Sequence, residues 1–96
     1  MNGIKIGDFA VSRAGHDFGK CYVIIKEDGE YVYLVDGKIR TLNTPKKKKV
    51  KHIKILEESQ ENITDKIHNH TIKNEEIKRA IKLLNKLSSE QGEEIS

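Results

Sequence analysis

The stretch CYVIIKEDGEYVYLV, residues 21–35, predicts two adjacent strands joined by a tight turn. Its first part, residues 21–25, is a short apolar run, which is typical of a strand covered on both faces. Asp28-Gly29 follows, and this pair is a strong hairpin signal because both residues readily adopt the backbone angles of a two-residue turn. In residues 31–35 two aliphatic side chains alternate with two tyrosines, so each kind occupies one face of the second strand.

Outward from this hairpin, similar signals predict further strands over residues 8–13, 38–42 and 50–56. Phe9 and Val11 share a face of the first of these, and Asp36-Gly37 is the hairpin signal before the second. No helical segment lies between the strands, which excludes a doubly wound sheet. We therefore expect a mainly β fold whose five short strands close into a small, highly curved barrel, because closure removes the open edges at which sheets aggregate.

Composition changes near residue 56, because all five aromatic residues and six of the seven glycines precede it. The polar segment after it is compatible with a short helical turn or with an ordered loop. Asn74 is then a good helix N-cap. A continuous apolar stripe follows it at helical spacing, consisting of Ile77, Ala80, Ile81, Leu84 and Leu87. We expect residues 1–56 to form the barrel, residues 57–73 a polar connector, residues 74–88 an amphipathic helix packed on the barrel, and residues 89–96 a frayed tail.

Charge is divided at the same place as composition. Residues 1–56 contain 12 basic and 6 acidic side chains, a charge of +6, whereas residues 57–96 contain 6 basic and 9 acidic side chains, a charge of −3. A basic region attracts polyanions through long-range electrostatics, and nucleic acid is the most common such partner. The asymmetry therefore predicts a nucleic-acid partner for the first half of the chain.

Membrane headgroups are the competing anion, but no stretch approaches 18 apolar residues and no signal sequence opens the chain. Cys21 is the single cysteine, so it cannot form an internal disulfide, and this fits a reducing compartment. We expect a cytoplasmic protein without a membrane partner.

The predicted nucleic-acid contacts are basic side chains near the turns and in the lysine run at residues 46–49. Lysine ammonium groups suit contacts with phosphates that do not depend on base sequence. The candidate RNA-binding residues are Arg13, His16, Lys20, Lys38, Arg40, Lys46, Lys47, Lys48, Lys49 and Lys51. The run is predicted to lie between two strands, which would hold it in place. The alternative is an ordinary solvated surface segment.

Glycines and tyrosines leave two interpretations open. In the loop AGHDFG, Gly15 and Gly19 either satisfy only the turn geometry or also let an RNA strand approach the backbone. The rings of Tyr31 and Tyr33 suit stacking on unpaired bases, but we expect them to pack beneath the C-terminal helix, whose apolar stripe needs a partner. Tyr22 is expected in the core.

Spacing argues against other kinds of site. The segment RAGHDFGK lacks the run of a phosphate-binding loop, and no Cys-x-x-Cys or His-x-x-x-His pair indicates a metal site. No nucleophile elbow or acid–base pair can be nominated, and 96 residues are too few for large enzyme folds such as the eight-stranded α/β barrel. We therefore expect a binding protein with no cofactor and no metal, and not an enzyme.

The segment GDFAVSRAGHDFGKCYVII, residues 7–25, resembles the KOW motif, a short glycine-containing segment of ribosomal proteins and transcription elongation factors. The continuation YVYLVDGKIRTLNTPKKKKVKHIKIL, residues 31–56, resembles the eukaryotic- and archaeal-type family of large-subunit ribosomal protein fourteen, and NEEIKRAIKLL, residues 74–84, resembles a helix that archaeal members place after their barrel. Many members carry a longer helical C-terminal extension than this chain has.

This resemblance implies a Src-homology-three-like barrel that binds ribosomal or other structured RNA through its loops. Gly19 matches the characteristic glycine of the motif, and Arg13, His16, Lys20 and the lysine run occupy the basic loop positions of the family. The expected function is therefore binding of ribosomal RNA by a ribosomal or ribosome-associated protein that is monomeric when free and that contacts large-subunit proteins. The alternative is a KOW-type protein-interaction module in a transcription or translation complex, because RNA would repel the acidic, amphipathic second half.

Overall fold

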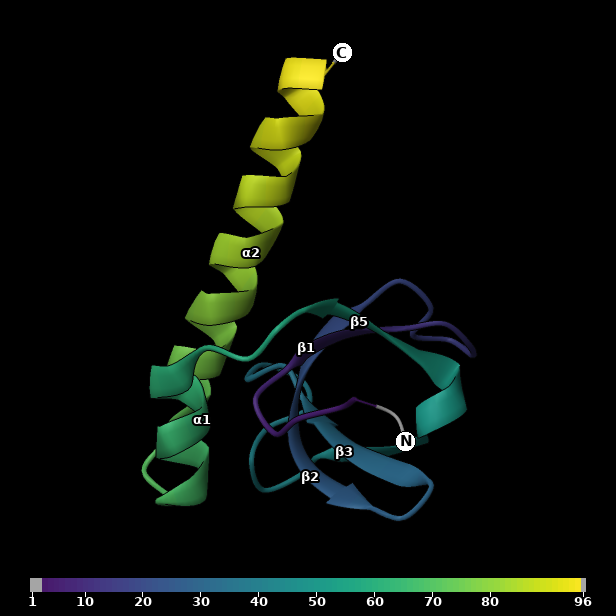
Figure 1. Cartoon of the computed structure of the whole chain (residues 1–96), viewed down its shortest axis with the longest axis vertical. Helices are drawn as coiled ribbons and strands as arrows, with labels where there is room; N and C mark the ends of the chain where they lie inside the picture. Colours follow the sequence, from purple (N-terminus) through teal and green to yellow (C-terminus); the bar gives the residue numbers. More distant parts are fainter. Residues whose placement is uncertain (1–2, 96) are drawn as a thin grey trace.

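The computed structural model describes the backbone of residues 3–95 and the side chains of residues 3–86. Over this part of the chain the protein is a five-stranded antiparallel sheet followed by two helices (Figure 1). The elements are β1 Phe9–Ser12, β2 Cys21–Asp28, β3 Tyr31–Val35, β4 Lys46–Lys49, the 3-10 helix η1 Val50–His52, β5 Ile53–Glu57, α1 Glu61–His68 and α2 Asn74–Ile95. The strand order is β4-β3-β2-β1-β5, which confirms the prediction of a mainly β fold with a C-terminal helix.

The sheet is curved but not closed, so the expected closed barrel is wrong in this respect. Its two edge strands are β4 and β5, and the described residues form no ladder between them. Instead, η1 connects the two edges directly, and β5 pairs only with β1, for example Ser12 with Ile53. Ile4 and Ile6 of the N-terminal segment pack against the inner face of the curved sheet and help to fill its interior.

The predicted strand over residues 38–42 does not form. In its place is a loop in which one carboxylate oxygen of Asp36 accepts hydrogen bonds from three successive backbone N–H groups, those of Lys38, Ile39 and Arg40, at 2.8–3.0 Å. These N–H groups are therefore unavailable for a sheet ladder. The lysine run takes the place beside β3 as strand β4, because backbone pairing does not require apolar side chains on an edge strand.

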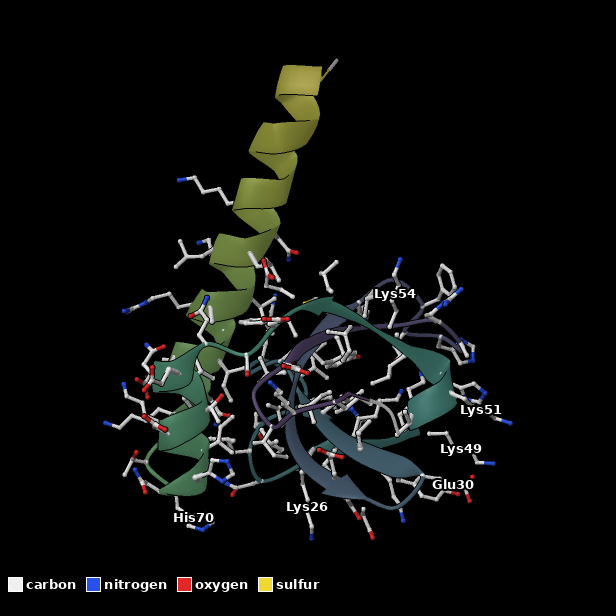
Figure 2. The ribbon with its side chains drawn as sticks, in the orientation of Figure 1. Lys26, Glu30, Lys49, Lys51, Lys54 and His70 are labelled. Carbon is white, nitrogen blue, oxygen red and sulfur yellow. The ribbon has the colours of Figure 1, made fainter. Side chains whose placement is uncertain are left out.

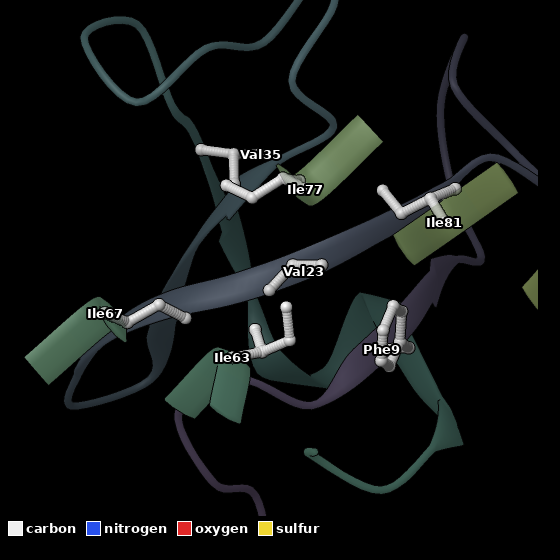
Figure 3. Close-up of a cluster of buried hydrophobic side chains, with 7 residues drawn as sticks. All are labelled: Phe9, Val23, Val35, Ile63, Ile67, Ile77 and Ile81. Atoms are coloured by element: carbon white, nitrogen blue, oxygen red, sulfur yellow. The ribbon is translucent and has the colours of Figure 1, made fainter. Parts of the chain in front are cut away.

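Strand β2 is covered on both faces, as its apolar run predicts. One face joins the outer cluster of Phe9, Val23, Val35, Ile63, Ile67, Ile77 and Ile81, in which strands and helices meet (Figure 3). The other face joins the inner cluster of Ala10, Tyr22, Ile24, Val32, Leu34 and Ile53, inside the curve of the sheet. Tyr22 is therefore a core residue, as expected.

The two helices cover part of the outer face of the sheet, around Phe9, Val23 and Val35. The segment left open in the sequence is partly helical, since α1 buries Ile63 and Ile67, spaced by four, in the outer cluster. Helix α2 buries Ile77 and Ile81 there, with Ala80 and Leu84 partly buried beside them, whereas the side chain of Leu87 lies outside the described side chains.

Helix α2 begins at Asn74, as expected, but its capping and its end differ from the expectation. Asn74 does not cap it, because its side-chain oxygen accepts a hydrogen bond from the N–H of Leu42 at 2.8 Å, and Glu76 caps the N–H of Lys73 instead at 3.0 Å. The helix continues to Ile95, beyond the predicted end at residue 88, and no proline interrupts it, although Gly92 lies within it. In residues 3–95, neither α1 nor α2 has the length and apolar character needed to cross a membrane.

Candidate nucleic-acid interface

Strand β4 divides the lysine run between two faces of the sheet. Successive side chains of a strand point to opposite faces, so Lys46 and Lys48 share one face and Lys47 and Lys49 the other. The first pair lies on the inner face, opposite Leu34 and Val32 of β3, and the second pair lies opposite the two tyrosines. The run is therefore neither a loop nor a uniformly solvated segment.

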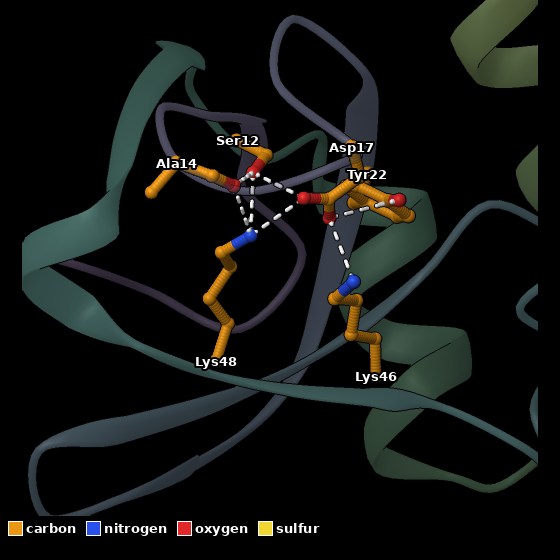
Figure 4. Close-up of polar contacts among 6 residues, drawn as sticks. All are labelled: Ser12, Ala14, Asp17, Tyr22, Lys46 and Lys48. Atoms are coloured by element: carbon orange, nitrogen blue, oxygen red, sulfur yellow. Dashed lines mark hydrogen bonds and ion pairs between the residues drawn. The ribbon is translucent and has the colours of Figure 1, made fainter.

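The inner lysines bind the buried carboxylate of Asp17, in the loop between β1 and β2 (Figure 4). Asp17 is only 5% exposed. One carboxylate oxygen accepts hydrogen bonds from Lys48 Nζ at 2.7 Å and from Ser12 Oγ at 2.9 Å. The other accepts one from the Tyr22 hydroxyl at 3.2 Å and pairs with Lys46 Nζ at 3.2 Å. We call these five side chains the Asp17 network.

Lys48 is saturated by this network. Its ammonium group also donates to Ser12 Oγ at 2.7 Å and to the carbonyl oxygen of Ala14 at 2.8 Å, so three acceptors match its three N–H donors. Lys46 and Lys48 were predicted to contact RNA; in the structure Lys48 is bound within the protein, and Lys46 is partly exposed but pairs with Asp17. Their role in the fold is to attach the β1–β2 loop to β4.

Hydrogen bonding keeps Asp17 ionised inside the protein. Burial by itself would raise the pKa of this carboxyl group, but the hydrogen bonds from Lys48, Ser12 and Lys46 outweigh burial and hold the pKa well below its ordinary value. Burial and the negative charge of Asp17 together raise the pKa of Tyr22 to about 12, so its hydroxyl remains a donor.

Acidic pH should therefore destabilise the protein through Asp17. Because its pKa is lower in the folded than in the unfolded protein, its contribution to the free energy of unfolding is complete above about pH 5 and is lost as the pH falls toward the folded-state pKa. Urea unfolding between about pH 7 and pH 2 should show a steeper loss below about pH 4 for the wild type than for Asp17→Asn, which has no carboxyl group to protonate. If the free energy of unfolding fell equally with pH in the two proteins, Asp17 would not be the group that destabilises the protein in acid.

The β1–β2 loop carries Arg13 and His16, and its start lies beside η1. Gly15 and Gly19 have positive φ angles of 83° and 88°, so both serve the turn geometry. The N–H of Arg13 donates to the carbonyl oxygen of His52 at 2.8 Å, which fixes the start of the loop against the end of η1. His16 lies on the same loop, and its side chain is exposed.

Lys49 and Lys51 project at the η1 end of the sheet, away from the helices, and Lys54 projects from β5 (Figure 2). Together with Arg13 and His16 they form what we call the loop–η1 surface. Within residues 3–86 the ion pairs involve only Lys46, Lys48 and Lys66, so none of the basic side chains of this surface is in an ion pair there, although Glu30 lies beside Lys49 and Lys51 (Figure 2). Lys54 follows Ile53 on β5 and is exposed.

A second group of cations lines a groove of about 560 Å³ between the start of β2, the loop after β3 and helix α2. Its lysines are Lys20, Lys38, Lys78 and Lys82, with Asp36 as the acidic member. Lys20 and Lys38 were predicted, whereas Lys78 and Lys82 lie in the acidic half of the chain and were missed. Their spacing of four on the predicted helix would have placed them on one face.

The remaining candidates lie apart from the loop–η1 surface. Arg40 is half-buried in the loop after β3, and its carbonyl oxygen accepts the N–H of Asp36 at 2.8 Å. The outward Lys47 lies over the rings of Tyr31 and Tyr33, with its Nζ 4.5 and 6.0 Å from their centroids. The expectation that these tyrosines pack beneath α2 is wrong, because Val23 and Val35 supply that contact instead.

Comparison with known proteins adds no family to this description. No protein-family model matches the chain, and no curated protein matches its sequence. Among the described residues, no three histidine, cysteine, aspartate or glutamate side chains gather as metal ligands would.

Proposed function

We propose that this protein binds RNA, as a ribosomal or ribosome-associated protein of the cytoplasm, and that the loop–η1 surface contacts RNA phosphates. The observation that supports this most is the set of basic side chains on two adjacent segments that form no ion pair within residues 3–86. Unpaired, exposed cations on a folded scaffold attract a sugar–phosphate backbone and release its counterions. The resemblance to KOW-type ribosomal proteins supports the same class of partner.

In this proposal the Asp17 network prepares the loop for binding. It joins the loop to β1, β2 and β4 through buried hydrogen bonds, so the loop loses little conformational freedom when RNA binds. Arg13 suits bidentate contact with a phosphate, and Lys49 and Lys51 act as flexible point charges. Such contacts position the RNA without reading its bases.

We also propose that the curved sheet is an open form of the Src-homology-three-like barrel that the resemblance implies. Its five short antiparallel strands, curled around an apolar interior, support this assignment. In such a fold the loops carry the binding residues, which agrees with the position of the loop–η1 surface.

Removing three cations of the loop–η1 surface should weaken RNA binding. In Lys49→Ala/Lys51→Ala/Lys54→Ala, we expect the affinity at physiological salt to fall roughly 10- to 100-fold, and the slope of log affinity against log salt to decrease by about 2, since each phosphate contact with a single strand contributes about 0.7. Fluorescence anisotropy with labelled ribosomal RNA fragments over a salt series measures both quantities.

The matched control is Lys73→Ala/Arg79→Ala/Lys86→Ala, which removes the same charge from exposed positions outside this surface. It should retain most of the affinity and of the salt slope. Equal losses in the two triple variants would refute a localised interface. Sedimentation of the native protein with large ribosomal subunits, before and after nuclease treatment, tests the ribosomal part of the proposal.

A second candidate function is protein interaction within a transcription or translation complex. A groove of about 640 Å³ lies between α1 and α2, on the acidic part of the chain. Its apolar lining includes Ile63, Ala80, Leu83 and Leu84, and Leu83 is 55% exposed. This function predicts a protein partner that is recovered equally well after nuclease treatment.

A further inference from the structure

We propose that the outer face of β2, β3 and β4 binds unpaired RNA bases, so that the preferred ligand is single-stranded RNA and not a perfect duplex. This inference rests on the proposed RNA binding. It concerns Tyr31 and Tyr33 and the lysines beside them, Lys26, Lys47 and Lys49, which we call the tyrosine–lysine face.

Strand pairing builds this face. Tyr31 and Tyr33 alternate along β3 with the fully buried Val32 and Leu34, so both rings are held on the outer side of the sheet. Residues two apart on one face of a strand lie about 7 Å apart, so each ring presents a separate contact site. On β4, Lys47 is opposite Tyr33 and Lys49 is opposite Tyr31.

A bulge in β2 adds a third lysine. The register between β2 and β3 shifts between Ile24 and Lys26, which places Lys26 opposite Tyr33. Lys26 Nζ lies 5.3 Å from the centroid of the Tyr33 ring, and Lys47 Nζ lies 4.5 Å from that of Tyr31. The rings are half-buried, and their accessible faces therefore carry lysine ammonium groups in the free protein.

Replacing the lysine ammonium groups on the tyrosine rings by stacked RNA bases is favourable. An exposed contact between an ammonium group and an aromatic ring is worth roughly 2- to 5-fold in an equilibrium constant, whereas stacking of a base on an aromatic side chain is worth roughly 5- to 150-fold. The lysine side chains are flexible, so they can move from the rings to the phosphates of the same nucleotides. The face therefore combines stacking and charge, as single-strand binders do.

Position and charge also favour this ligand. Lys49 belongs both to this face and to the loop–η1 surface, so one RNA strand can pass from one to the other along the side of Lys49 that faces away from Glu30. On the far side, Asp28 is opposite Tyr31 and limits the path at the β2–β3 turn. A rigid duplex keeps its bases stacked internally and offers none to the rings.

The test replaces both tyrosines by leucine, which retains apolar volume but has no aromatic face, and by phenylalanine, which retains the ring. Binding of labelled oligouridylate is compared with binding of an RNA duplex of the same length. We expect Tyr31→Leu/Tyr33→Leu to lose roughly 10- to 100-fold in affinity for oligouridylate, with duplex affinity unchanged. The phenylalanine variant should bind both ligands like the wild type, and urea unfolding checks that each variant is folded.

Intrinsic tyrosine fluorescence gives an independent readout, because the chain contains three tyrosines and no tryptophan. Oligouridylate should quench the emission of the wild type, but not that of the leucine variant, which retains only the buried Tyr22. If the leucine variant binds oligouridylate as tightly as the wild type and its fluorescence is still quenched, this inference is overturned, while the proposed RNA binding stays intact. If the wild type binds neither oligouridylate nor duplex, the proposed function itself fails.

Discussion

Replacing Asp17 with alanine should lower the free energy of unfolding by about 3 to 5 kcal/mol, because it leaves two buried or partly buried ammonium groups without their carboxylate. Lys48 is the more affected of the two, since only 9% of its side chain is exposed. A domain of this size is stable by only about 5–15 kcal/mol, so much of the total would be lost. Urea unfolding followed by circular dichroism measures the change.

The control for this substitution is Asp28→Ala, which removes a carboxylate from the exposed β2–β3 turn and should change stability by less than about 0.5 kcal/mol. Combining Asp17→Ala with Lys48→Met replaces the charged pair by apolar groups and should recover a substantial part of the loss. A small effect of Asp17→Ala alone, or strict additivity in the double variant, would contradict the Asp17 network.

The same substitution should weaken RNA binding at a distance. Asp17 is buried, so RNA bound at the surface would not touch it. Its hydrogen bonds nevertheless fix the loop that carries Arg13 and His16. In this respect Asp17 is a positioning residue for the loop–η1 surface. Its loss should reduce affinity while the exposed charge of that surface stays the same.

Replacing Gly37 with alanine should have the second large effect. Gly37 has a φ angle of 78°, and a Cβ atom there would contact the carbonyl oxygen of Asn74 and lie 2.9 Å from the backbone nitrogen of Lys78. Both atoms belong to the first turns of α2, so the helix would have to move away from the loop. We expect a loss of about 2 to 5 kcal/mol, from the strained backbone angle together with the overpacking.

Gly29→Ala is the matched control. Gly29 also has a positive φ angle, 60°, but a Cβ atom there has no neighbour within 4 Å, so only the cost of the backbone angle, about 1 to 2 kcal/mol, applies. Hydrogen exchange should show that Gly37→Ala loosens α2 in particular. Equal destabilisation by the two substitutions would mean that α2 does not pack against this loop.

Local patterns predicted much of the fold. The apolar run at the start of β2, the hairpin between β2 and β3 and the apolar stripe of α2 each depend on neighbouring residues, and each forms where the sequence indicated, except that the two loop residues of the hairpin are Gly29 and Glu30. The predicted strand after Val35 failed because the Asp36 side chain competes for the backbone N–H groups of the next residues. The Asp36-Gly37 pair predicts a turn, but it does not show whether the Asp36 carboxylate will bind the backbone N–H groups that follow.

The candidate site was harder to predict because it depends on contacts between distant segments. Asp17 lies in a loop of turn-forming residues, and nothing in its neighbours indicates that it is buried against Lys46 and Lys48, about thirty positions later. Likewise, four identical lysines contain no pattern that shows which of them face inward. Their division became apparent only from the pairing of β4 with β3.

The division of β4 has a consequence for how this gene can change. Insertion or deletion of one codon within the lysine tract alters the net charge by a single unit, yet it shifts every residue on one side of the change to the opposite face of the strand. The length of the tract is therefore constrained more tightly than its charge. Over generations, arginine should be accepted in place of Lys47 or Lys49, whereas Lys48 should resist it, because a planar guanidinium does not fit the three acceptors that a compact ammonium fills.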